Sequence, residues 1–364
     1  MPEGARVVRI FVRRSRDISY LVDDRALELE GAREGAALWW PLGERGVTSA
    51  TDVLSRREGA VVGYDIVLAA PRPTSCLLAV GTPEEQRAVI GAHRGAVTGA
   101  LAYLEDRAVV ERRVVLGDVD ELPRRLRAAV GFTHGVNRAG EPHLHDHVLV
   151  GAVPATSSRP LDGRSLFDHS RAADALYRAA LRDGLSRVTE RTAWRTFRGN
   201  EFVSGVDEGV RALWPGRASD REPKHQWSRK DIESRWRDDL RSYEPGPQIT
   251  PPSRGRDQLN EHAFGAALEG PSLIRRQEVV AAWADAATFG ATDRDVERAV
   301  SRWYGELSRE RGRGTLTLSR ARARMDGVVR EEGPRLIRDE AIHEKSRERS
   351  SGRARESARW ERNR

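Results

Sequence analysis

The chain has 364 residues, of which 38% are hydrophobic and 32% are charged, so it is long enough for one large domain and a smaller one. Its 62 Lys and Arg outnumber its 55 Asp and Glu, and the net charge of +7 favours a polyanionic partner such as nucleic acid or a membrane surface. The one cysteine, Cys76, excludes a disulfide framework and a thiolate metal site.

Neither a membrane span nor a signal peptide is expected from the sequence. No apolar run approaches the roughly 18 residues that a membrane-spanning helix needs. The opening stretch MPEGARVVRIFVRRSRD lacks the apolar core of a signal peptide. A GxxxxGK[ST] phosphate loop is also missing from the sequence, which argues against an ATP-driven motor. We therefore expect a cytoplasmic protein without membrane insertion.

The first half of the chain combines strand-type and helix-type patterns. Thr82-Pro83-Glu84-Glu85 offers a helix N-cap, a first-turn proline and a capping-box glutamate. A second helix is predicted from about Ser170 to Val188, with an apolar face and an arginine-bearing face. Short runs rich in β-branched residues predict strands at residues 7–12, 61–69, 109–116, 128–134 and 145–153. The mixture predicts an α+β fold in which helices flank a sheet.

The composition changes after residue 243. Residues 244–256, EPGPQITPPSRGR, form a proline- and glycine-rich stretch that we interpret as a linker after a large domain over residues 1–243. Residues 257–330 have a helical pattern, with Thr292 as an expected N-cap. Residues 331–364 are almost wholly charged and small, and we expect a disordered tail there.

Four of the nine histidines lie within FTHGVNRAGEPHLHDHVLVGAV. Because side chains alternate faces along a strand, His145 and His147 point to the same side. The turn-rich loop before them allows antiparallel pairing with the preceding strand, which would bring His134 to the same face. Three imidazoles on rigid strands, with one coordination position left open, are typical of a catalytic metal site.

Other interpretations of this cluster stay open at this point. The histidines could be half-buried polar residues without a ligand, and His143 could compete as a fourth ligand. The string HLHDH also resembles the HxHxDH motif of metallo-β-lactamase-like hydrolases, but it is one residue too short. Further His and Asp ligands of that family do not follow downstream. A metal-dependent hydrolase therefore stays a lesser alternative.

The segment FTHGVNRAGEPHLHDHVLV resembles the metal-binding motif of TrwC-like (MobF-type) conjugative relaxases, within the HUH endonuclease group. GYDIVLAAPRPTS is similar to a second block of that family, whose aspartate aligns with Asp65. Ile18-Ser19-Tyr20 resembles the segment that carries the nucleophilic tyrosine. The resemblance covers roughly residues 1–240, without the family's C-terminal helicase, and implies a central antiparallel sheet flanked by helices.

What the resemblance implies is site- and strand-specific nicking at an origin of transfer. His134, His145 and His147 would bind a divalent cation, with Mg²⁺, Mn²⁺ and Zn²⁺ all open. Tyr20 would attack the phosphodiester and form a 5′-phosphotyrosyl intermediate. Asp65 would accept the tyrosine proton or orient a ligand histidine. Many relatives carry paired tyrosines, whereas Leu21 follows Tyr20 here, and Arg72 replaces the lysine of the second block.

The expected partner is single-stranded or hairpin DNA at the origin of transfer of a plasmid or an integrated element. Accessory relaxosome proteins, a coupling protein and a separate helicase are further expected partners. Aromatic platforms for bases are expected among Trp39, Trp40, Trp194 and Trp227. Phosphate contacts are expected from Arg72, Arg171, Arg178, Arg182, Lys224 and Lys230.

Two rivals remain beside the relaxase and the hydrolase. A rolling-circle replication initiator of the HUH group would use similar histidines, but such initiators place the tyrosine after the histidines, and Tyr20 precedes them. A non-catalytic DNA-binding protein with a decayed active site would keep the histidines without a working nucleophile.

Overall fold

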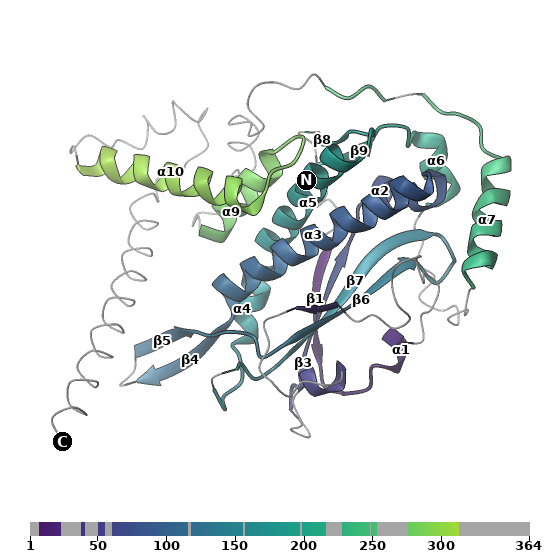
Figure 1. Ribbon diagram of the computed structural model, residues 1–364. Coiled ribbons are helices and arrows are strands. Elements are labelled where there is room, and N and C mark those ends of the chain that lie inside the picture. Colours follow the sequence, from purple (N-terminus) through teal and green to yellow (C-terminus); the bar gives the residue numbers. More distant parts are fainter. Residues whose placement is uncertain are drawn as a thin grey trace.

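The computed structural model describes residues 7–22, 38–40, 50–54, 60–115, 118–155, 157–196, 199–215, 228–247, 249–252 and 276–312. Its centre is a five-stranded sheet in which all neighbouring strands are antiparallel (Figure 1). In spatial order the strands are β1 (Val8–Arg13), β3 (Gly63–Ala69), β7 (Pro142–Gly151), β6 (Ala129–Val136) and β2 (Leu38–Trp40). The α+β fold with an antiparallel central sheet is thus confirmed.

Helices α3 (Pro83–Ala108) and α5 (Ser170–Val188) pack over one face of this sheet, as Figure 1 shows. α3 begins where the sequence predicted, because Thr82 accepts from the Glu85 amide while the Glu85 side chain accepts from the Thr82 amide. Val8 and Ile10 of β1 and the even-numbered residues of β3, such as Ile66, are buried in the core that contains these helices. The odd-numbered residues of the same strands face the other side of the sheet.

The opposite face has a smaller apolar cluster. Leu21 of α1 (Ser19–Val22) and Val53 of η2 (Ala50–Val53) pack there against Val130 and Leu149. The remaining described elements lie around the sheet. They are α2 (Arg72–Val80), β4 (Val110–Val115), β5 (Asp118–Pro123), α4 (Gly163–Asp168), β8 (Ala193–Arg195), β9 (Glu201–Val203), α6 (Glu208–Leu213) and α7 (Arg229–Arg241).

Two helices beyond the linker belong to the same hydrophobic core as α3 and α5. α9 (Arg276–Ala286) packs along α5, and α10 (Asp293–Gly312) packs against α9. Thr292 caps α10 through its hydrogen bonds with Asp295, as predicted. The core therefore continues past residue 243, although the domain boundaries themselves stay a prediction. The predicted tail over 331–364 lies outside the described residues.

The five predicted strands and two predicted helices are all found. The sequence did not predict α2 or the short strands β2, β5, β8 and β9. None of the helices in the described ranges is long and apolar enough to cross a membrane.

Candidate metal and nucleophile site

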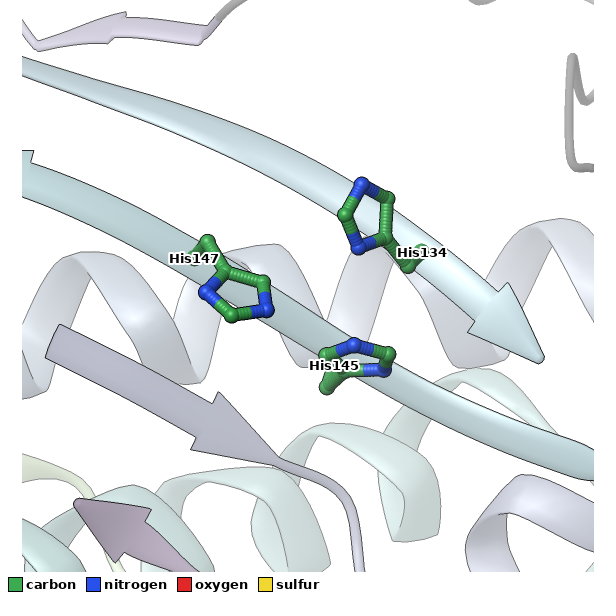
Figure 2. Close-up of side chains that lie close together, drawn as sticks. All are labelled: His134, His145 and His147. Carbon is green, nitrogen blue, oxygen red and sulfur yellow. The ribbon is translucent and has the colours of Figure 1, made fainter. Parts of the chain in front are cut away.

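Three histidines meet on the face of the sheet opposite α3 and α5. β6 and β7 pair so that His134 lies opposite His145, and Phe132 lies opposite His147. One ring nitrogen from each histidine lies within 4.8 Å of those of the other two. Figure 2 shows the three rings converging from the two neighbouring strands. The predicted pairing is confirmed, and the triad is close enough to hold a metal ion.

Backbone carbonyl groups determine which ring nitrogen coordinates in two of these histidines. His134 Nε2 lies 3.1 Å from the carbonyl oxygen of Leu21, and His145 Nδ1 lies 2.8 Å from that of His143. A carbonyl oxygen only accepts hydrogen bonds, so these two nitrogens carry the hydrogen. The lone pair then lies on Nδ1 of His134 and on Nε2 of His145, which are the atoms that can coordinate a cation.

Burial keeps His143 and His145 of β7 uncharged. The pKa of His145 is well below its usual value because burial disfavours the imidazolium, and the neighbouring histidines oppose a positive charge there. Burial likewise lowers the pKa of His143 to about 4, with a further contribution from Arg72. Neutral imidazoles can donate a lone pair, so this donor set fits a divalent cation that accepts nitrogen ligands.

Asp65 connects the triad to Tyr20. Its carboxylate accepts from His147 Nδ1 at 3.0 Å, which leaves Nε2 of that ring to coordinate. The Tyr20 hydroxyl donates to Asp65 Oδ2 at 2.9 Å. Arg13 donates to the Tyr20 oxygen and lies 4.0 Å from Asp65 Oδ2. Metal ligand, carboxylate and phenol therefore form one continuous chain of hydrogen bonds.

The surroundings of Tyr20 keep its hydroxyl protonated. Burial raises its pKa to about 12, and the negative charge of Asp65 acts in the same direction, while Arg13 opposes it. A phenol in this setting needs a proton acceptor at the moment of attack, and Asp65 already accepts its hydrogen bond.

Arg13 is the site residue that sequence reasoning missed. It ends β1, seven positions before Tyr20, and only the turn of the chain between them brings its guanidinium to the hydroxyl. A second group missed by the sequence lies behind the triad, on the helix side of the sheet. There, buried His93 of α3 bonds Asp146 at 3.0 Å and Tyr177 of α5 at 2.8 Å. In the sequence of β7, Asp146 lies between the triad residues His145 and His147. These hydrogen bonds therefore connect β7 to α3 and α5.

The predicted DNA-contacting residues have different positions. Arg171 is exposed on α5 and Lys230 is exposed on α7, so both remain candidates for phosphate contacts. Arg72 begins α2 and forms an ion pair with Glu141 at 2.9 Å. Lys224 lies outside the described residues.

The prediction is wrong for Arg178 and Arg182, because both are buried. Arg178 pairs with Asp174 at 2.7 Å and with Asp285 of α9 at 3.3 Å. Arg182 pairs with Glu201 at 2.7 Å and donates to two carbonyl groups at the end of α9. Arg178 and Arg182 of α5 are thus covered by α9, and these two side chains cannot reach a DNA backbone.

The tryptophans predicted as base platforms are also partly corrected. Trp194 is buried and stacked on Phe202, so it does not present its ring to a ligand. The backbone of Trp39 and Trp40 forms β2, but their side chains are outside the described part of the chain, as is Trp227.

A family model described as TrwC relaxase matches residues 25–235. Solved structures of the conjugative relaxase TrwC share the fold. A copper-bound complex with oriT DNA aligns with a TM-score of 0.51 and 20% identity, covering 64% of this chain and 97% of the other. A metal-free complex with oriT DNA gives 0.51 and 19%, with the same coverage. A complex with a 27-mer DNA comprising the recognition hairpin and the cleavage site gives 0.50 and 19%, again with 64% and 97% covered. The search of curated proteins found no match.

Proposed function

Because the chain belongs to the TrwC relaxase family of DNA-nicking enzymes, we propose that it cuts one DNA strand at an origin of transfer through a covalent bond to Tyr20. The matched residues begin at position 25, after Tyr20. The assignment of the nucleophile therefore depends on the geometry of this site. The main support for Tyr20 as the nucleophile is the chain of hydrogen bonds from Tyr20 through Asp65 to the triad residue His147.

The residues around Tyr20 support a transesterification. Tyr20 Oη attacks the phosphorus as its proton passes to Asp65, and the bond from phosphorus to the 3′ oxygen breaks. The leaving 3′ oxygen takes up a proton from solvent and becomes a hydroxyl, while the 5′ phosphate stays on Tyr20. One ester replaces another, so the reverse reaction can reseal the strand.

Each charged group near Tyr20 has a separate part in this step. Arg13 donates to the phenol oxygen and stabilises the negative charge that develops there as the proton leaves. Asp65 also holds the His147 ring in the orientation that directs Nε2 towards the triad centre. A divalent cation held by His134, His145 and His147 would polarise a non-bridging oxygen of the phosphate.

Single-stranded or hairpin DNA is the substrate that we propose. The similar solved structures contain oriT DNA, one of them with a recognition hairpin and a cleavage site. Exposed Arg171 and Lys230, together with Arg72 at the start of α2, are the described basic residues proposed to contact phosphates. Lys224 stays a proposal from sequence. The proposed setting is cytoplasmic mobilisation of a plasmid or integrated element, with accessory relaxosome proteins, a coupling protein and a separate helicase.

The test uses labelled single-stranded oligonucleotides tiled over both strands of the DNA that flanks the coding region. Protein and Mg²⁺ or Mn²⁺ are added, and the products are separated under denaturing conditions. We expect one oligonucleotide to give a denaturation-resistant protein adduct and a free 3′-hydroxyl fragment. The adduct should be lost in Tyr20→Phe and after removal of metal with EDTA.

Tyr64→Phe is the matched control, since Tyr64 lies on β3 but is buried on the helix side of the sheet. This variant should still form the adduct. Metal-dependent cleavage without an adduct would point to attack by water and contradict the tyrosine mechanism. Binding without any cleavage would favour a decayed active site.

A further inference from the structure

The edge strand β1 presents a second set of side chains on the same face as the histidine triad. Val8 and Ile10 are buried against the helices, so Arg9, Phe11 and Arg13 face the other side of the sheet. Arg13 contacts Tyr20 there, which confirms the orientation of the whole odd-numbered set. β1 is bonded to β3 alone among the described strands, so this row lies at the margin of the site.

The strand register gives the distance of this row from the reacting groups. Phe11 lies directly opposite Asp65, and Arg9 lies opposite Val67, which in turn lies opposite His147. Side chains directly opposite each other on antiparallel strands have Cβ atoms about 5 Å apart. Phe11 is therefore next to the carboxylate that receives the Tyr20 proton, on the side away from the triad.

Phe11 and Arg9 are both exposed to solvent, and neither side chain contributes to the packed core. Phe11 is 50% exposed to solvent, which is unusual for a phenylalanine beside a buried carboxylate. Arg9 is exposed, and no acidic side chain in the described ranges forms an ion pair with it.

We propose that Arg9 and Phe11 form a subsite for one nucleotide of single-stranded DNA beside the scissile phosphate, with the base stacked on Phe11 and its phosphate on Arg9. This inference rests on the proposed function and extends it by naming where the strand runs past Tyr20. The path leads from the triad across β3 to the edge of the sheet at β1.

Charge and spacing favour single-stranded DNA as the occupant. Residues two apart on a strand are about 7 Å apart, so an aromatic ring and a guanidinium alternate along β1. A ring with an accessible face and a neighbouring cation is the combination that stacks an unpaired base and contacts its backbone. Residues 9–16 hold four arginines and no acidic residue, which suits a polyanion. A base within a duplex is already stacked and cannot cover Phe11.

Fluorescence anisotropy of labelled oligothymidylate in the absence of metal tests the subsite without any cleavage. Phe11→Ala should raise the Kd by about 5- to 150-fold, the effect expected for one lost base stack. Phe11→Trp should bind at least as tightly as the unchanged protein. Phe167→Ala is the matched control, because Phe167 of α4 is similarly exposed, at 43%. It should leave the Kd unchanged.

A second readout places the subsite relative to the nick. In a Tyr20→Phe background, 2-aminopurine is substituted at successive positions of the oligonucleotide that forms the adduct. Its fluorescence should be quenched at one position next to the cleavage site, and Phe11→Ala should restore it. Quenching confined to distant positions would overturn the placement beside the scissile phosphate.

The possible results distinguish a failure of the subsite from a failure of the tyrosine mechanism. An unchanged Kd in Phe11→Ala, with adduct formation intact, overturns the subsite alone. A raised Kd with no adduct from any oligonucleotide overturns the tyrosine mechanism and supports the subsite. If Phe11→Ala leaves the Kd unchanged but abolishes self-association in sedimentation, the exposed edge is a contact between copies of this chain, and the subsite is overturned.

Discussion

Tyr20 and His147 bond to the same carboxylate, with the Tyr20 hydroxyl 2.9 Å from Asp65 Oδ2 and His147 Nδ1 3.0 Å from both Asp65 oxygens. The nucleophile and the metal ligand therefore share one positioning group. A change at Asp65 must affect both halves of the mechanism, whereas changes at Tyr20 should affect only one.

Asp65→Asn should weaken metal binding as well as cleavage. The amide keeps the shape of the side chain but loses the charge that orients His147 and accepts the Tyr20 proton. Loss of such a partner typically costs 10- to 100-fold in metal affinity. Isothermal titration with Mn²⁺ measures it, and Tyr20→Phe is the control that should retain the affinity. Equal affinity in Asp65→Asn would show that Asp65 does not orient the ligand.

Asp285→Ala should destabilise the whole protein, although it lies in α9, beyond the linker. Its carboxylate pairs with Arg178, which is buried, and with Arg195, which is largely shielded from solvent. Removing one partner of a buried pair costs about 3–5 kcal/mol. We therefore expect the free energy of unfolding of Asp285→Ala, measured with urea, to fall by about this amount. Asp238→Ala, an exposed pair on α7, is the control and should change it little.

The same packing predicts that a chain ending at Tyr243 is not a stable unit. Val279 and Val280 of α9 are buried in the core that contains α3 and α5, and their loss would expose apolar surface on α5. Such a chain should aggregate or unfold at a lower temperature than the full chain in a thermal scan. A shortened chain with an unchanged melting temperature would contradict this account of the core.

Glu111 should stabilise the fold at neutral pH and lose that effect in acid. Hydrogen bonds from Arg113 and Ser157 lower its pKa to about 2, with Arg124 acting in the same direction. A pKa below the unfolded value of about 4.5 stabilises the native state above pH 4.5. The effect is lost as the pH falls towards 2.

We therefore expect Glu111→Gln to lower the free energy of unfolding by about 2 kcal/mol at pH 7. The difference from the unchanged protein should shrink steadily in urea titrations carried out between pH 4.5 and pH 3. A difference that is independent of pH in this range would show that the carboxylate charge is not responsible.

Cys76 should be inert in the folded protein. Burial raises its pKa to about 12, so the reactive thiolate is scarce near pH 8, and the side chain is inaccessible. Labelling with a thiol reagent should be slow in native protein and complete in denaturant. Because the chain has one cysteine, the labelled fraction directly reports unfolding. Fast labelling of native protein would contradict the packing of α2.

Local patterns in the sequence were sufficient to predict several features. The capping box at Thr82 and Glu85 depends on residues three apart, and the triad depends on the alternation of His145 and His147 across a hairpin. The position of Arg13 against Tyr20 was not predictable, because it depends on how the turn after β1 folds back. The burial of Arg178 was also beyond local pattern, since α9 covers it from about 100 residues further along the chain.

In the proposed mechanism Tyr20 becomes covalently bound to the 5′ phosphate of the cut strand. The most direct measurement is mass spectrometry of the adduct after digestion with protease and nuclease. We predict a peptide that contains Tyr20 and carries the mass of the attached nucleotide on that residue. A nucleotide on any other side chain, or a cleaved strand with no modified peptide, would contradict attack by Tyr20.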